Sequence, residues 1–208
     1  MVMAKPRQNP PRLLPAALAT DLERAAGMIA RLDSALACHP LCPAWAWRAR
    51  LDAIRHQAAV DGKAIDPWHL AALIEGVRLR LDHMPALIDR GVLFAAAQHA
   101  FGLYRWFAMP DPAQRAAIQQ AVEHLQSAGS AHSPLLGAAL GVHAWLDQGG
   151  ERPPIRAALA LYWQRRGVTA LPCPLLTGAS ALGAETPWAR EAWIGHFLAA
   201  LAQEAADG

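Results

Sequence analysis

The sequence predicts an all-helical domain of about eight helices, and three observations support this fold class. Valine, isoleucine and threonine together number only 19 of 208 residues, whereas alanine and leucine fill most apolar positions. Alanine and leucine favour helix, and the β-branched residues favour pleated sheet. Helix-capping residues are followed directly by proline four times, and apolar residues recur at helical spacing toward the C-terminus. With 54% hydrophobic residues, the chain can bury a sizeable core.

The cap–proline pairs predict where four of the helices begin. They are Asp66–Pro67, Asp111–Pro112, Ser133–Pro134 and Thr186–Pro187. The cap side chain accepts a hydrogen bond from a free N–H group of the first turn, and proline loses nothing there because its missing N–H would be unpaired. Thr20 to Glu23 resembles a capping box, and Gly62 and Gly167 stand where helices should stop.

These signals and the apolar periodicity predict a single helical domain over residues 16–208, after a disordered tail at 1–15 that is rich in proline and basic residues. The last helix carries a core stripe of Trp188, Trp193, Phe197 and Leu201. The irregular stretch 168–185 is long for a compact domain, so we expect it to be either functional or a packed strap. The predicted helices span residues 20–38, 43–60, 66–81, 86–108, 112–128, 134–146, 153–166 and 187–206.

Composition argues against several classes of protein. A net charge of +2 with scattered arginines does not indicate DNA or RNA binding, because specific binders concentrate basic residues on one face. The most apolar run, 92–108, is interrupted by Gln98, His99 and Arg105, which are costly inside a bilayer. Three cysteines make an odd set for a disulfide framework. We therefore expect a cytoplasmic protein that does not enter a membrane.

The run Cys38-His39-Pro40-Leu41-Cys42 contains residue types that bind zinc, but its spacing is poor. No second Cys/His pair lies at the distance of a zinc finger, and Cys173 would have to come from far along the chain. We favour a turn between two helices with buried thiols that pack as small apolar groups.

The segment from His143 to Arg156 is the strongest candidate site. A histidine lies in the last turn of one helix, Asp147 and two glycines form the turn, and arginines open the next helix. Such a turn can bind phosphate through backbone N–H groups and arginine, with an aspartate on a metal ion and a histidine as general base. The residues by themselves more strongly favour a simpler reading, a Gly-Gly turn with surface arginines.

This segment resembles the Fic signature, His-x-Phe-x-(Asp/Glu)-Gly-Asn-Gly-Arg-x-x-Arg. His143, Trp145, Asp147 and Gly150 fall on the histidine, the aromatic residue, the acid and the second glycine. Two further stretches are similar to the Ile-Glu-Gly helix and to the closing helix of Fic proteins, and they span residues 72–78 and 187–198.

The resemblance implies a Fic-like helical bundle and transfer of AMP from ATP to a protein hydroxyl. His143 would then be the catalytic base, Asp147 would hold Mg²⁺, and the nucleotide phosphates would be bound by Gly149, Gly150, Arg152 and Arg156. The motif departs from the family at Gln148, Gly149 and Glu151, and an acid beside a triphosphate repels it. We therefore expect a degenerate, regulatory or protein-interacting domain, with active protein adenylyl transfer as the alternative.

A closer likeness, over almost the whole chain, is to the helical N-terminal region of bacterial helix-turn-helix DNA-binding proteins of unknown role. In those proteins a DNA-reading domain follows. Either the chain is a fragment of such a transcriptional regulator, or this member lacks that domain. We expect DNA binding only through a domain that is not present here, and a partner protein or a second copy as the binding partner.

Glu75 and Gly76 match the inhibitory helix of many Fic proteins, in which the glutamate blocks the second arginine of the motif; Ala71 replaces the usual hydroxyl residue. The resemblance thus predicts that Glu75 contacts Arg156, or Arg152 if the turn shifts. The alternative is that Glu75 faces solvent and pairs with Arg78 or Arg80 along its own helix.

Overall fold

A computed structural model describes residues 14–77, 90–183 and 188–208, and within these ranges all regular secondary structure is helical. The predicted all-helical fold is therefore confirmed. A short 3-10 helix, η1, was not expected from the sequence. The elements are α1 (Ala16–Leu36), α2 (Cys42–Val60), α3 (Pro67–Ile74), α4 (Arg90–Ala108), α5 (Pro112–Gly129), α6 (Pro134–Asp147), α7 (Arg152–Arg165), η1 (Ala179–Leu182) and α8 (Arg190–Asp207).

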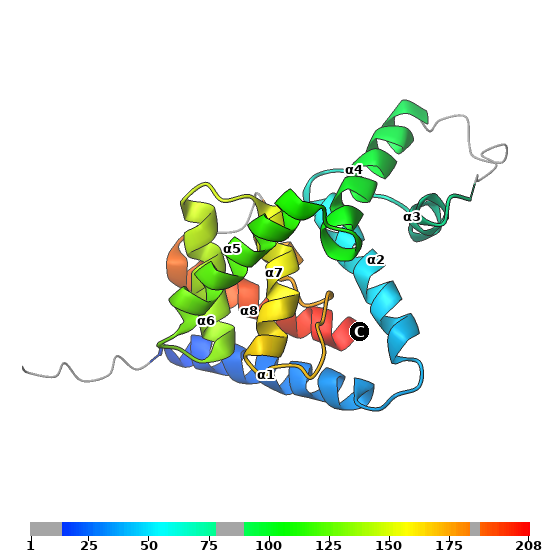
Figure 1. Ribbon diagram of the computed structural model, residues 1–208. Helices are drawn as coiled ribbons and strands as arrows, with labels where there is room; N and C mark the ends of the chain where they lie inside the picture. Colours follow the sequence, from blue (N-terminus) through cyan, green and yellow to red (C-terminus); the bar gives the residue numbers. More distant parts are fainter. Residues whose placement is uncertain (1–13, 78–89, 184–187) are drawn as a thin grey trace, which may run out of the picture.

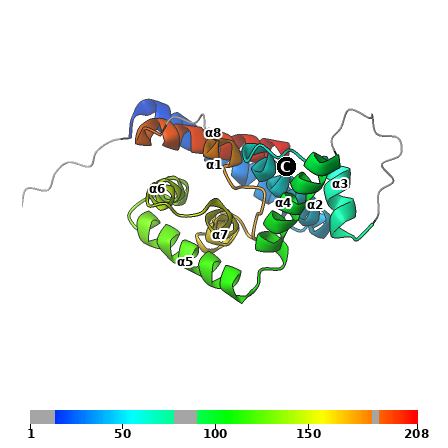
Figure 2. The same cartoon turned by 90° about the horizontal axis from the view of Figure 1, so that it is seen from above.

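Most of the molecule is one body in which α1 and α8, which lie far apart in sequence, run side by side and make the most extensive helix contact. Helices α5, α6 and α7 pack together against them (Figures 1 and 2). Their shared core contains Trp163, Trp193 and Phe197, all fully buried. This body contains the candidate turn between α6 and α7.

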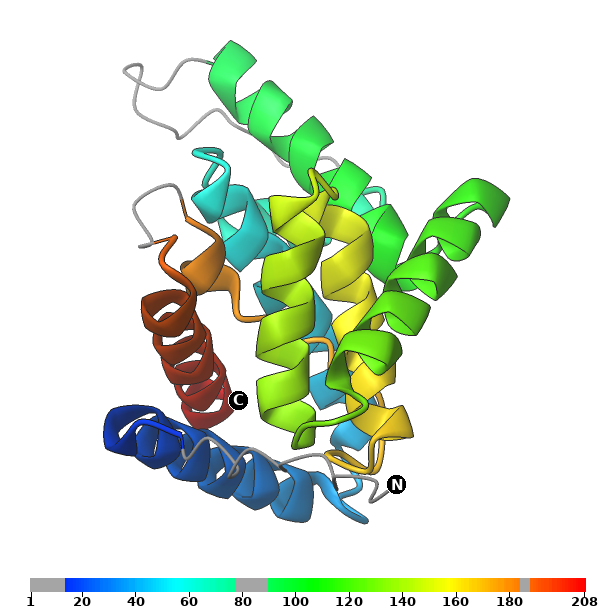
Figure 3. The same ribbon diagram turned by 90° about the vertical axis from the view of Figure 1, so that its left-hand side faces the viewer.

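Helices α3 and α4 form a smaller unit, here called the arm, which packs on α2 and extends away from α6 and α8 (Figures 1 and 3). The arm and α2 share a second apolar cluster that includes Ile54, Leu70 and Leu103. Phe107, at the end of α4, contacts both clusters and so connects the arm to the body.

The local signals for helix ends were mostly correct. Asp66 accepts hydrogen bonds from the N–H groups of Trp68 and His69, and Asp111 forms a capping box with Gln114. Helix α6 also begins at its predicted proline, although the Ser133 side chain makes no capping bond. The helices before Gly62 and Gly167 end there, and both glycines have positive φ, which favours glycine.

Other boundaries were wrong. Helix α1 begins at Ala16, and Thr20 lies inside it with its hydroxyl donating to the Ala16 carbonyl, so the predicted capping box is absent. Helix α3 ends at Ile74 rather than at 81. Helix α8 begins at Arg190, which leaves Trp188 outside the helix and 47% exposed. The expected start at Thr186–Pro187 lies outside the described residues.

Residues 168–183, here called the strap, connect α7 to the segment before α8 and are mostly buried despite their irregular backbone. Every residue from Cys173 to Ala179 is buried. The Trp163 indole N–H donates to the Leu176 carbonyl at 2.8 Å. Of the two expectations for this stretch, the packed strap is confirmed.

No helix within the described ranges has the length and apolar character required to cross a membrane.

Candidate functional site

The turn between α6 and α7 is closed by its own hydrogen bonds. Gly149 adopts φ of +79°, and its N–H donates to the Leu146 carbonyl at 3.0 Å. The Gly150 N–H donates to the Trp145 carbonyl at 2.9 Å. This is the bonding pattern of a glycine-terminated helix. The two N–H groups expected to bind phosphate are therefore already used.

Each glycine in this turn has a structural reason. Gly149 supplies the left-handed conformation that ends α6. A Cβ on Gly150 would overlap the indole of Trp145, whose N–H donates to the Glu151 carbonyl at 2.8 Å. The turn is thus held from both sides by Trp145, and its glycines are explained without a ligand.

The N-terminus of α7 offers few donors to an anion. Its first three residues are Arg152, Pro153 and Pro154, and proline has no backbone N–H. The residue at the cap is Glu151, whose side chain makes no capping bond. A helix N-terminus attracts phosphate through free N–H groups and a positive end. Here two of those N–H groups are missing and a carboxylate stands beside them.

His143 and Asp147 do lie together, and Trp188 engages both. The His143 ring stacks on the Trp188 ring with 4.6 Å between centroids, and its Nε2 lies 3.2 Å from the Trp188 carbonyl oxygen. A carbonyl can only accept, so this contact is a hydrogen bond when Nε2 carries the proton. The Trp188 indole N–H donates to Asp147 at 3.2 Å. This contact occupies one oxygen of the carboxylate expected to hold a metal.

Arg152 is engaged away from the turn. Its guanidinium lies 3.2 Å from Asp61, at the end of α2, and the other oxygen of Asp61 is 2.8 Å from Nε2 of His99 on α4. These three side chains are partly buried and tie α7 to α2 and the arm. Arg152 therefore serves as a link between helices in this structure.

Arg156 is fully buried and points toward the strap. It donates to the Thr177 hydroxyl at 2.9 Å and to the Ala53 carbonyl at 3.4 Å. Burial lowers its pKa to about 10, and the nearby charge of Glu204 opposes that shift. Arg156 is therefore charged at neutral pH and helps to hold the strap.

Glu204 completes this buried network, and sequence reasoning missed it. Its carboxylate accepts the backbone N–H groups of Thr177, Gly178 and Ala179, each at 2.8 Å. Burial raises the pKa of Glu204, and these three donors, together with Arg156, act against the shift. A signal was available, because Glu204 lies on the same face of α8 as the buried Leu201 and Ala205.

The expected contact of Glu75 with Arg156 or Arg152 is wrong. Glu75 is exposed at the end of α3, and none of the described ion pairs or hydrogen bonds joins it to either arginine. Helix α3 lies at the other end of the molecule from α6 in two views (Figures 1 and 2). The alternative partners, Arg78 and Arg80, fall outside the described residues.

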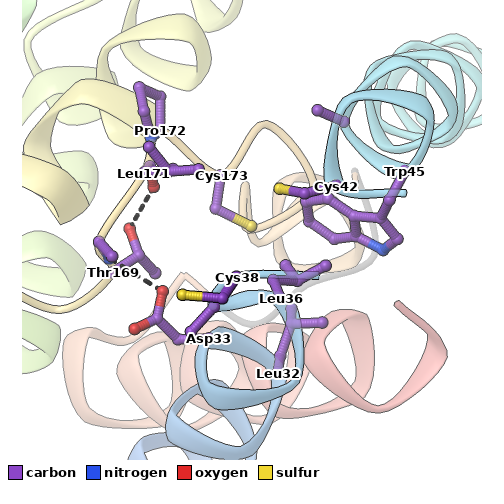
Figure 4. A pocket seen from close by; sticks show the side chains of 13 residues that line it. Leu32, Asp33, Leu36, Cys38, Cys42, Trp45, Thr169, Leu171, Pro172 and Cys173 are labelled. Carbon is purple, nitrogen blue, oxygen red and sulfur yellow. Dashed lines mark hydrogen bonds between the residues drawn. The ribbon is translucent and has the colours of Figure 1, made fainter. Parts of the chain in front are cut away.

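All three cysteines of the chain line one apolar cavity of about 260 Å³, between the α1–α2 turn and the strap (Figure 4). Cys38 is exposed with φ of +63°, whereas Cys173 is buried, which raises the pKa of its thiol to about 11. Within the described residues, no three His, Cys, Asp or Glu side chains are placed to hold a metal ion. The expected turn between two helices is confirmed, because residues 37–41 connect α1 to α2. The expected burial of its thiols is wrong, since Cys38 is exposed and Cys42 is only partly buried.

Comparison with known proteins identifies no relative. No family model matches the chain, no curated protein matches it, and no solved structure matches its fold.

Proposed function

We propose that this chain is a non-catalytic regulatory domain that acts by contact with another protein, on a Fic-like scaffold whose nucleotide turn has been converted into a structural turn. The observation that carries the proposal is the exposed apolar surface of the arm. Six large apolar side chains of α3, of residue 77 just after it and of α4 are more than a third exposed. They are Trp68, Leu73, Val77, Val92, Phe94 and Phe101.

Such exposure of large apolar side chains on one unit is unusual. Trp68 is 78% exposed and Phe94 is 65% exposed. Scattered apolar side chains are normal on protein surfaces, but several large ones gathered on one unit are typical of a contact site. The partly buried links of Asp61 to Arg152 and His99 fix the arm to the body. A partner on the arm would thus meet a preformed surface.

The occupied donors of the turn support the non-catalytic part of the proposal. Phosphoryl transfer depends on positioned donors around the phosphates, and here the N–H groups of Gly149 and Gly150 are bonded within the turn. Labelled ATP with Mg²⁺ should therefore give no transfer to the chain or to a generic target protein. Transfer that disappears in His143→Ala would instead support an adenylyltransferase.

Site-specific photocrosslinking in living cells tests the contact surface. A photoreactive phenylalanine analogue placed at Trp68 or Phe94 should yield discrete crosslinked products. The same analogue at Leu171, which is 57% exposed on the strap, is the matched control. Equal crosslinking from the arm and from Leu171 would show that the arm has no special role in contacts.

A further inference from the structure

Helix α4 exposes a continuous stripe along the side that faces away from its neighbours. Its buried positions are Ala96, Ala100 and Leu103, and the last two belong to the apolar cluster shared with α2 and α3. At 100° per residue, Gln98 lies almost directly opposite the middle of that buried face. The exposed residues around it are Gly91, Phe94, Ala95, Gln98, Phe101, Gly102 and Arg105.

The stripe has a near two-fold pattern about Gln98. Phe94 and Phe101 lie on one edge, one turn before and one turn after Gln98, and Ala95 and Gly102 lie on the other edge at the same two levels. If a second copy of α4 runs antiparallel, with the two-fold axis at Gln98, Phe94 meets Phe101 of the second copy. Ala95 meets Gly102 of the second copy in the same arrangement.

The small-residue edge lets two helices approach closely. A Cβ added to Gly102 would have no neighbour within 4 Å, so that edge is open, and small residues at a helix interface allow short distances between backbones. The charge of Arg105 is already paired with Asp111 at 3.3 Å. The central part of the stripe, from Phe94 to Gly102, carries no charged residue.

We propose that α4 pairs with α4 of a second copy of this chain in an antiparallel, two-fold arrangement centred on Gln98. This inference rests on the proposed function, because it names the partner of the arm. Self-association through one shared patch is the commonest form of protein dimer. The near-symmetry of the stripe favours a second copy over an unrelated helix. Only pairing with a second copy in antiparallel orientation requires the stripe to show the same pattern in both directions.

The exposed area of the stripe determines the affinity that we expect for the dimer. Phe94 and Phe101 are 65% and 37% exposed, which corresponds to roughly 200 Å² of aromatic surface covered in each copy. Stable interfaces cover about 800 Å² per partner. Gln98 and the small residues add only part of the difference, so we expect a reversible dimer with a Kd on the order of 10–100 µM.

A charge exchange at Gln98 tests the two-fold axis. Sedimentation velocity of the wild-type chain should show the mass rising from 22.3 kDa toward twice that value as concentration increases. Gln98→Glu and Gln98→Lys should each raise Kd at least about tenfold, because like charges then face each other. An equimolar mixture of the two variants should restore the dimer, since residue 98 meets itself only at this axis.

Gln120→Glu and Gln120→Lys on the exposed face of α5 are the matched controls and should leave the dimer unchanged. Circular dichroism checks that every variant is folded. A dimer that tolerates both Gln98 variants, or a mixture that stays monomeric, would overturn the α4 pairing. A wild-type chain that is monomeric throughout, with arm crosslinks to a different protein, would overturn the dimer and leave the proposed function intact.

Discussion

The strap and the arm combine backbone regularity and burial in opposite ways. The strap has irregular backbone, yet the N–H groups of residues 177–179 are buried and bonded to Glu204, and the Thr177 hydroxyl accepts from Arg156. The arm is regular helix, yet it leaves large apolar side chains such as Trp68 in solvent. Regular secondary structure therefore does not distinguish the stable part of this protein from the part available for contact. We expect stability to be concentrated where buried polar groups are hydrogen-bonded, and contact with a partner where large apolar groups are exposed to solvent.

The largest effect should come from Glu204. Glu204→Ala leaves three buried N–H donors without their acceptor and removes the carboxylate charge near the buried Arg156, so we expect the free energy of unfolding to fall by about 3–5 kcal/mol. Urea denaturation followed by circular dichroism measures the change. Glu191→Ala, at an exposed position in the first turn of the same helix, should lower the free energy of unfolding far less. Equal losses for the two variants would contradict the role of Glu204 in holding the strap.

A second experiment separates backbone strain from packing in the strap. Gly178 and Gly149 have similar positive φ, +63° and +79°, but a Cβ on Gly178 would overlap Phe197, whereas one on Gly149 would meet nothing within 4 Å. Gly149→Ala should lower the free energy of unfolding by about 1 kcal/mol. Gly178→Ala should cost a further ~1–3 kcal/mol. The same loss from both variants would mean that the strap shifts freely to accept a methyl group.

The smallest effect should come from the arm. Trp68→Ala removes a side chain that is 78% exposed, so the free energy of unfolding should change by less than about 0.5 kcal/mol. Trp193→Ala, at a fully buried position, provides the contrast and should cost about 3–5 kcal/mol. A loss from Trp68→Ala close to that of Trp193→Ala, measured by urea denaturation, would show that the arm contributes to the core.

Sequence reasoning succeeded where the physics is local. The bonds of Asp66 and Asp111 join residues two or three positions apart, so a few letters contain the whole interaction. The predicted start of α8 is wrong: the cap–proline pair Thr186–Pro187 predicts a helix from there, whereas α8 begins at Arg190. A signal for a helix start thus predicted the presence of α8 but not its first residue.

The candidate site was harder to predict because its partners are distant in sequence. Arg156 was expected beside Glu75, but Thr177, Ala53 and Glu204 surround it. Which groups lie beside a buried cation depends on helix packing, and local spacing does not contain that information. The sequence predicts a glycine turn after His143. It does not predict whether the N–H groups of that turn are free, because Gly-Gly sequences suit both a closed helix end and an anion site.

The pairing of α1 with α8 has a consequence for synthesis. Among the described helices, α1 leaves the ribosome first and α8 leaves it last, yet they form the most extensive helix pair. The carboxylate that satisfies the strap is on α8 as well. The helices made earlier can form locally while translation continues, because helix formation is fast, but their core cannot close until α8 emerges. Folding of the body is therefore expected to finish after translation of α8, with apolar faces exposed to chaperones until then.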